Sequence, residues 1–235
     1  MLSAIVLAAG NSGRMGRPKA LLEYRGELFI ERVCASLRSA GVPERIAVLG
    51  RDAPAILSVW RPSGEKVVVN PDPDLGQLSS LRTGLSAASP EAEGFMVCLA
   101  DQPEILPDTY KEVISFWSSH KESIVIPRCI RPPTLPAFPS ENRHSVQKHT
   151  TGKRSPPPTL DTRLLVSFGY KRGHPIILPA SCRKLCIEGP LEEGLHWVTH
   201  HPSVKVLDLD VPDTGIIRDC DTPGDYERLS APGGT

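Results

Sequence analysis

Several features that place a chain in a broad class are missing from this sequence. Its 27 basic and 27 acidic side chains cancel, so charge gives no case for nucleic acid as the main partner, although a small anion is compatible with it. No apolar run reaches the roughly 18 residues of a membrane span, and no basic leader with a long apolar stretch opens the chain. We therefore expect a cytoplasmic protein that binds neither nucleic acid nor membrane.

The cysteines also lack a familiar pattern, because no two of the six form a C-x-x-C pair. Cys34 and Cys98 lie in apolar segments typical of a core. We expect reduced, structural thiols at all six positions. These are Cys34, Cys98, Cys129, Cys182, Cys186 and Cys220.

What the 235 residues do contain is a regular alternation of short apolar runs with stretches of helix-like spacing. The runs are rich in β-branched residues and are expected to form strands buried on both faces. The alternation predicts βαβ units in an α/β fold, a three-layer, doubly wound and mostly parallel sheet whose ligands bind beyond the carboxyl ends of its strands. Strands are expected at 4–7, 45–49, 66–69, 95–99 and 123–126, and helices at 29–40, 53–60, 79–88 and 108–120.

A glycine-rich loop follows the first of these strands. Its glycines stand at every third position over residues 10–16, so the backbone can turn sharply and approach a ligand. Arg14, Arg17 and Lys19 can meet negative charge there, which favours phosphate. The spacing matches neither a Walker loop nor a Rossmann dinucleotide loop, and an ordinary turn is the alternative. Because Lys19 follows Pro18, we expect it on an extended segment and not at the start of a helix.

Asp101 stands at the end of the apolar run 95–99. Pro103 prevents the chain from continuing as strand or helix, which leaves the carboxylate at the rim of the sheet. A hard oxygen donor beside a phosphate site is a natural Mg²⁺ ligand, and a helix or turn cap is the alternative.

Residues 70–85 pass through a proline turn and are expected to enter a helix near Ser79. The usual role of such a serine is to cap the helix. Ser79 and Ser80 could also offer hydroxyls and backbone N–H groups to a base or ribose. Arg82, one turn later, is either a surface charge or a phosphate contact.

Two polar segments follow near the C-terminus. His174 lies in a Gly-His-Pro sequence ahead of an apolar run, where a histidine is more often a turn or packing residue than a catalyst. Segment 218–226 is expected to be a strand end followed by a helix with Pro223 at its first position. Of Asp219 and Asp221 we expect no more than one to face a metal.

Taken in order, five motifs resemble those of the MobA-like nucleotidyltransferases, most of all the molybdenum cofactor cytidylyltransferases. Together they are far more specific than any one alone. The resemblance covers roughly residues 1–127 and 170–230. The motifs are L-A-A-G-x-S-x-R-M-G-x-x-K at 7–19, the stretch 76–85, A-D-Q-P at 100–103, G-H-P at 173–175 and D-x-D-T-P-x-D at 219–225.

The resemblance implies a reaction between a nucleoside triphosphate and a phosphate-bearing acceptor, with pyrophosphate as a product. The implied acceptor is molybdopterin or its molybdenum form, and a molybdoenzyme or its chaperone is a candidate partner. The GTP-using relatives typically carry glycine where this chain has Ala9, which favours CTP. Displacement at the α-phosphorus needs charge neutralisation and in-line positioning more than a covalent nucleophile.

Roles for single residues also come from the resemblance. Arg14 and Lys19 would neutralise the triphosphate and the departing pyrophosphate, and with Asp101 they are the implied catalytic residues. Asp101 would hold Mg²⁺, with Asp219 or Asp221 as the second carboxylate. The implied nucleotide-binding residues are Leu7, Ala8, Ala9, Gly10, Arg14, Lys19, Ser79 and Ser80, and the implied acceptor-side residue is His174.

Residues 1–230 are expected to form a single nucleotidyltransferase domain, with a proline-rich basic insertion at about 128–169. Eight of the 24 prolines lie between Pro127 and Pro158, and the segment 128–172 holds nine Lys or Arg against two acidic residues. This composition argues against regular structure. We favour a flexible insertion without catalytic consequence over a basic flap that covers an anionic acceptor.

Two other functions remain open. A sugar-phosphate or other alcohol-phosphate nucleotidyltransferase would share the loop and the aspartates but differ at the acceptor side. A nucleotide-binding accessory protein that assists cofactor insertion would not need metal carboxylates, so Asp101 and Asp221 argue against it. A dehydrogenase-type dinucleotide module lacks its fingerprint.

Overall fold

One mixed sheet forms the middle layer of the molecule, in a computed structural model that describes residues 1–10, 13, 15–130 and 169–230. Its strands are β1 (Leu2–Ala8), β4 (Glu44–Leu49), β5 (Lys66–Val69), β6 (Gly94–Leu99), β7 (Ser123–Ile130), β8 (Tyr170–Arg172), β9 (Ile176–Pro179) and β10 (Lys205–Asp210). They lie in the order β10-β7-β9-β6-β1-β4-β5, and β8 pairs with β7. A separate two-stranded sheet joins β2 (Glu23–Tyr24) to β3 (Glu27–Leu28).

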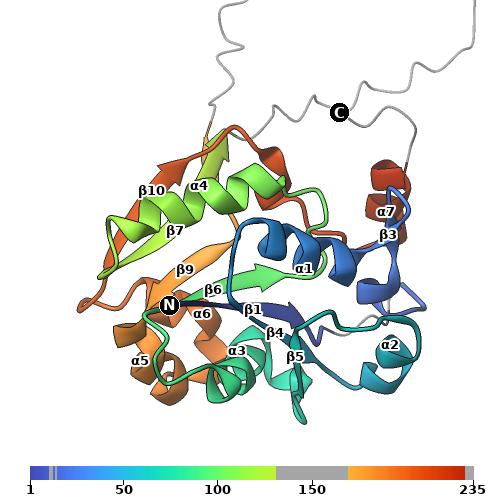
Figure 1. The fold of residues 1–235 in the computed structure, drawn as a ribbon, viewed down its shortest axis with the longest axis horizontal. Helices are drawn as coiled ribbons and strands as arrows, with labels where there is room; N and C mark the ends of the chain where they lie inside the picture. The colour runs from blue at the N-terminus through green and yellow to red at the C-terminus, as the bar shows by residue number, and fades with distance from the viewer. Residues whose placement is uncertain (11–12, 14, 131–168, 231–235) are drawn as a thin grey trace, which may run out of the picture.

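Helices cover both faces of this sheet (Figure 1). Along β1, Ala4 and Val6 pack with one set of helices, whereas Ile5 and Leu7 pack with the other, as expected for a strand buried on both sides. On the first face lie α1 (Phe29–Ser39), α2 (Ala53–Val59) and α4 (Pro107–Ser118), and on the second lie α3 (Gln77–Ala87), α5 (Arg183–Glu188) and α6 (Gly194–Thr199).

The predicted fold class is confirmed, as are the five strands predicted between residues 4 and 126 and the four helices predicted between residues 29 and 120. The expectation that each strand is buried on both faces is wrong for β5, because this strand is the outermost of the sheet and only β4 pairs with it. The six cysteines are free and buried, as expected. Among the helices of the described residues, none is both long and apolar enough to span a bilayer.

The strand order places a crevice at the carboxyl ends of β1 and β6. From β1 the chain passes outward to β4 and then β5, and it returns to the other side of β1 as β6; all of these pairs are parallel. In an open α/β sheet, ligands bind where the direction of winding reverses in this way. The glycine-rich loop leaves β1 at this point, and residues 100–103 leave β6 there.

Strand β9 runs antiparallel to β6, with Ile176 paired to Val97 and Pro179 paired to Gly94. Its first residue therefore lies toward the carboxyl end of β6. Residues 173–175 precede β9, whereas the glycine-rich loop and residues 100–103 follow their strands. Because β9 runs in the opposite direction, all three segments lie at the same edge of the sheet.

The ends of the basic insertion are regular, contrary to the expectation from composition. β7 continues through Ile130, and β8 pairs antiparallel with it, with Ile130 opposite Tyr170. Asp208 on β10 accepts hydrogen bonds from Arg128 and Arg172, which ties the two arms to the sheet. Residues 131–168, and with them the choice between flexible insertion and basic flap, lie outside the described residues.

Candidate active site

A cavity of about 460 Å³ opens at the carboxyl ends of β1 and β6. The glycine-rich loop forms one wall, and the start of α3 forms another. Of the nucleotide-binding and catalytic residues expected from the sequence, Leu7, Ala8, Ala9, Gly10, Lys19, Ser80 and Asp101 line this cavity. Arg14 falls outside the described residues.

A glycine that sequence reasoning did not single out packs against Ala9, which lines this cavity. Gly50 directly follows β4 and lies so close to the loop after β1 that a Cβ atom on it would be 2.7 Å from the carbonyl oxygen of Ala9. Any side chain here would push the Ala9 backbone away. The sequence shows a glycine directly after an apolar run, but it does not show that this glycine contacts Ala9.

Lys19 begins a single 3₁₀ turn, Lys19–Leu21, with Pro18 before it. The expectation of an extended segment is therefore wrong. Proline restricts the residue that precedes it, and it is well tolerated just before a helical turn, so Pro18 placed no restriction on Lys19.

The ammonium group of Lys19 lies between two carboxylates from distant parts of the chain. Its Nζ is 3.1 Å from Oδ2 of Asp101 and 2.5 Å from Oδ1 of Asp221. Lys19 and Asp101 are largely buried, whereas the Asp221 side chain is half exposed. Three segments therefore meet at one cation. They are the turn after the glycine-rich loop, the end of β6 and the C-terminal segment.

Burial and charge act against each other in this cluster. Burial raises the pKa of Asp101, the ammonium of Lys19 opposes that rise, and the negative charges of Asp219 and Asp221 add to it. Burial alone would lower the pKa of Lys19, but its bonds to Asp221 and Asp101 outweigh that effect and raise the pKa. The lysine is thus held charged among carboxylates that repel one another.

Ser79 does not cap a helix, because α3 begins two residues earlier with Gly76 in the capping position. Its hydroxyl instead accepts a hydrogen bond from Nδ2 of Asn70 at 3.0 Å and donates to the carbonyl of Asp72 at 3.2 Å. Ser79 therefore holds the turn behind the cavity, and Ser80 is the serine that lines it. Asn70 is buried and bonds both hydroxyls.

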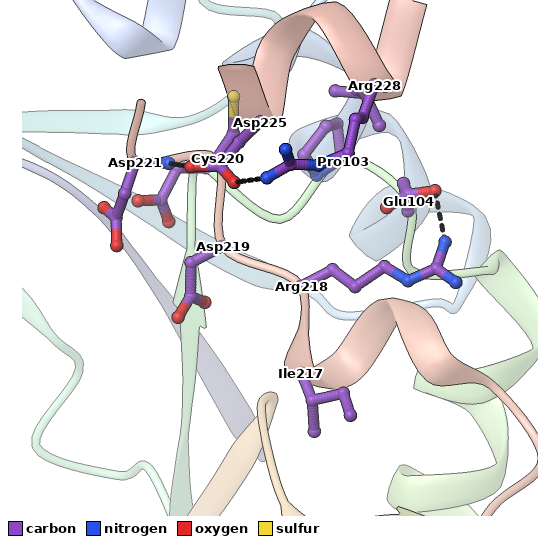
Figure 2. A pocket seen from close by; sticks show the side chains of 11 residues that line it. Pro103, Glu104, Ile217, Arg218, Asp219, Cys220, Asp221, Asp225 and Arg228 are labelled. Atoms are coloured by element: carbon purple, nitrogen blue, oxygen red, sulfur yellow. Dashed lines mark hydrogen bonds and ion pairs between the residues drawn. The ribbon is translucent and has the colours of Figure 1, made fainter. Parts of the chain in front are cut away.

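Residues 218–222 form a loop and not the expected strand end, since a 3₁₀ turn, Thr214–Ile217, precedes them. Asp219 and Asp221 extend to the same side of this loop (Figure 2). Both side chains line one cavity of about 570 Å³. That no more than one of them faces a metal stays a prediction.

Helix α7 (Pro223–Ser230) begins with the expected proline and fixes the end of this loop. The backbone N–H of Thr222 donates to Oδ2 of Asp225 at 2.7 Å, and the N–H of Asp225 donates back to the Thr222 hydroxyl at 3.2 Å. This reciprocal pair is a capping box, so Thr222 is the N-cap of α7.

A second cavity, of about 300 Å³, is lined by His174, the residue expected on the acceptor side, and by Gln102 and Asp219 among others. Nε2 of Gln102 donates to Oδ1 of Asp219 at 2.6 Å. Gly173 packs so closely against Ile216 that a Cβ atom on Gly173 would overlap the Ile216 carbonyl. Sequence reasoning placed Gln102 in a motif but assigned it no role.

The cavities share lining residues. Leu99 and Gln77 line both the 460 Å³ and the 300 Å³ cavities. A third cavity of about 570 Å³, shown in Figure 2, shares Asp101 with the first and Asp219 with the second. Two ligands in the first two cavities would therefore face each other across Leu99 and Gln77.

The described residues hold no group of three or more His, Cys, Asp and Glu side chains arranged as a complete metal cage. Such a cage is not required for Mg²⁺, which usually binds through one or two carboxylates together with substrate phosphates and water. The cluster of Asp101 and Asp221 around a cation has this donor chemistry.

Arg82 is not a phosphate contact in this structure. Its Nε donates to the carbonyl of Cys186 at 2.8 Å, and its Nη2 donates to the carbonyl of Gly189. Both acceptors lie at the end of α5, so Arg82 joins α3 to that helix.

A doubly wound sheet with a glycine-rich loop at its switch point, and with Asp101 after the neighbouring strand β6, defines a Rossmann-like fold with a ligand site at the carboxyl ends of its strands. Comparison with protein families identifies the class. The MobA-like NTP transferase domain matches residues 4–206, and the chain belongs to this family.

Individual relatives are consistent with this membership. Nicotine blue oxidoreductase of Paenarthrobacter nicotinovorans is 37% identical over 103 residues, which cover 43% of this chain and 50% of that protein. The match thus spans about half the length of that curated relative. The crystal structure of Rv0371c from Mycobacterium tuberculosis H37Rv is 27% identical, with a TM-score of 0.69 over 97% of this chain and 96% of that one. Its manganese complex superposes with a TM-score of 0.66 at 24% identity, covering 97% of both chains.

Proposed function

We propose that this protein transfers a cytidylyl group from CTP to the phosphate of molybdopterin or its molybdenum form and releases pyrophosphate. The observation that carries this proposal is the ammonium of Lys19 between Asp101 and Asp221, beside the 460 Å³ and 570 Å³ cavities that share Asp101. This cluster would supply neutralising charge and metal-type ligands to a bound triphosphate.

In the proposed reaction an oxygen of the acceptor phosphate forms a bond to the α-phosphorus. The bond from that phosphorus to the bridging oxygen of the β-phosphate breaks, and pyrophosphate leaves with the electron pair. Charge neutralisation and alignment supply most of the rate in such transfers. Lys19 would neutralise the triphosphate, while the loop from Leu7 to Gly10 would hold it through its backbone.

We assign the metal site to Asp101 and Asp221, which already share a cation. A bound Mg²⁺ would supply further neutralisation of the phosphates. The manganese complex of Rv0371c supports the use of a divalent ion in a relative of the same fold. Asp219, held by Gln102, would lie on the acceptor side.

The choice of CTP rests on Ala9, which lines the nucleotide cavity where GTP-using relatives typically have glycine. We further propose that residues 1–230 act as one catalytic domain. A molybdoenzyme or its chaperone would then receive the product.

The test is to incubate the purified protein with each of the four nucleoside triphosphates, Mg²⁺ and molybdopterin, and to measure pyrophosphate release. We expect release with CTP, little with GTP, and none after chelation of the metal. Asp101→Asn should lower turnover by about a hundredfold or more while leaving the circular dichroism spectrum unchanged. Release with a sugar phosphate and not with the pterin would favour the sugar-phosphate alternative. No release with any triphosphate would overturn the proposal.

A further inference from the structure

The acceptor-side cavity has a wall made of two imidazole rings. His196 and His200 lie one helical turn apart at the end of α6, and their rings stack with centroids 3.8 Å apart and planes 18° from parallel. Both line the 300 Å³ cavity. Nδ1 of His200 lies 3.0 Å from the carbonyl oxygen of His196 and 3.1 Å from the hydroxyl oxygen of Thr199, and these two contacts hold the ring in one orientation.

Residues with unsatisfied polar atoms also line this cavity. Of the three buried side-chain polar atoms that lack a hydrogen-bond partner among the described residues, two belong to this cavity: Oε1 of Gln102 and Nε2 of His174. Buried polar atoms are nearly always paired in folded proteins. Two unpaired atoms on one wall therefore indicate that something else completes it.

The orientation of the Gln102 amide is determined by its neighbours. Its Nε2 donates to the carbonyl of Ile216 at 3.2 Å and to Oδ1 of Asp219 at 2.6 Å. Turning the amide over would set its oxygen against two acceptors. Oε1 is thus a fixed acceptor, and its missing partner must be a hydrogen-bond donor.

These observations together describe a ligand. The stacked rings suit a flat aromatic body, the cavity floor includes apolar Leu99 and Ile216, and Gln102 requires a donor. We infer that the cavity binds the ring of the acceptor, a flat nitrogen heterocycle that donates an N–H to Gln102 and packs against His196 and His200. This inference rests on the proposed function, because it names what lies beyond the acceptor phosphate.

The first test uses 6-carboxypterin, a fluorescent flat heterocycle with ring N–H groups, and 2-naphthoate, a flat anion without them. Binding of both to the full-length protein is measured by titration, without nucleotide. We expect 6-carboxypterin to bind about tenfold more tightly than 2-naphthoate. Gln102→Met should abolish this preference, and equal binding of both probes to the unaltered protein would overturn the role of Gln102.

The second test concerns the stacked rings. His196→Ala/His200→Ala should weaken both probes by about tenfold, whereas His196→Phe/His200→Phe, which keeps flat rings, should restore binding. His201→Ala is the matched control, because His201 follows the pair in sequence but does not line the cavity. Unchanged binding in the alanine variant, or no recovery in the phenylalanine variant, would overturn the role of the rings.

A turnover measurement separates this inference from the proposed function. If the unaltered protein releases pyrophosphate with molybdopterin, the alanine variant should raise the acceptor KM and leave the CTP KM unchanged. Equal KM values in both proteins would contradict the inference alone. Absence of release from the unaltered protein would contradict the proposed function, while the two binding titrations still decide the inference.

Discussion

Lys19 is the residue on which the proposed site depends, because its ammonium lies between the two carboxylates to which we assign the metal ion. Its ammonium neutralises Asp101 and Asp221 in the structure. A divalent ion that binds the same carboxylates must displace it or compete with its charge. Without nucleotide, the metal should therefore bind weakly. With the triphosphate bound it should bind more tightly, because the phosphates can pair with Lys19 in place of the carboxylates.

Replacing Lys19 should consequently have opposite effects on metal binding and on turnover. Lys19→Met should tighten Mn²⁺ binding in the absence of nucleotide, measured by electron paramagnetic resonance, and lower turnover by about a hundredfold or more. Lys66→Met is the matched control, since Lys66 pairs with Glu44 at the amino edge of the sheet. Weaker Mn²⁺ binding in Lys19→Met would contradict this account.

At the scale of single residues, His174 should also make the free energy of unfolding depend on pH. Burial lowers its pKa to about 4, while the charge of Asp219 acts in the opposite direction. Below about pH 6.5 His174 binds a proton in the unfolded chain but stays neutral in the folded protein. The free energy of unfolding therefore falls as the pH drops toward 4. Between pH 7 and pH 4.5 the loss from this group should be about 2 to 3 kcal/mol.

Urea unfolding of the unaltered protein and of His174→Gln at both pH values measures this loss. The variant should lack it, so its stability should fall less between the two pH values. Carboxylates that titrate in the same range are common to both proteins and cancel in the comparison. Parallel losses would show that His174 is not buried in its neutral form.

At the scale of elements, the packing of α3 on the sheet decides where Ser80 and Gln77 stand. Gly84 makes that packing close, because a Cβ atom on it would overlap Cγ2 of Ile5 and lie 3.1 Å from Cγ2 of Val48. Gly84→Ala should therefore lower the free energy of unfolding by about 1 to 3 kcal/mol. Denaturant unfolding measures the change.

The same substitution in another helix provides the control. A Cβ atom on Gly224 in α7 would have no neighbour closer than Nη1 of Arg228 at 3.7 Å. Gly224→Ala should thus be neutral or stabilising by up to about 1 kcal/mol. If both variants lost the same stability, helix propensity and not packing would explain Gly84.

Most elements could be predicted because their signals are local. Five apolar runs and four helical patterns lie where the structure has β1, β4 to β7 and α1 to α4. The ends of the insertion could not be predicted, since the pairing of Ile130 with Tyr170 joins residues on either side of a long segment. The ends have the same basic composition as the rest of the insertion, and they form strands only because each pairs with another strand of the sheet.

At the scale of the molecule, this hairpin offers a test of the insertion. Because Ile130 faces Tyr170, residues 131–169 can be replaced by Asn-Gly, which closes a two-residue hairpin. We expect an unchanged melting temperature and unchanged KM values for both substrates, measured by calorimetry and pyrophosphate release. A large rise in the acceptor KM alone would instead favour the basic flap.

The sequence alone determined the fold class, the glycine-rich loop after β1 and the position of Asp101 after β6, because each depends on residues that are neighbours in the chain. Periodicity specifies an element, and a glycine loop after a strand specifies its own turn. The family also followed from motifs that can be read in order, and it is now shown over residues 4–206.

Only the tertiary structure decided how these parts combine. It placed Lys19 between Asp101 and Asp221, and it reversed β9 so that His174 reaches the ligand edge. It also left Gln102 with a fixed and unpaired oxygen. The physical reason is that strand direction and charge pairing are set by contacts between residues far apart in the chain, whereas sequence patterns report only local preference.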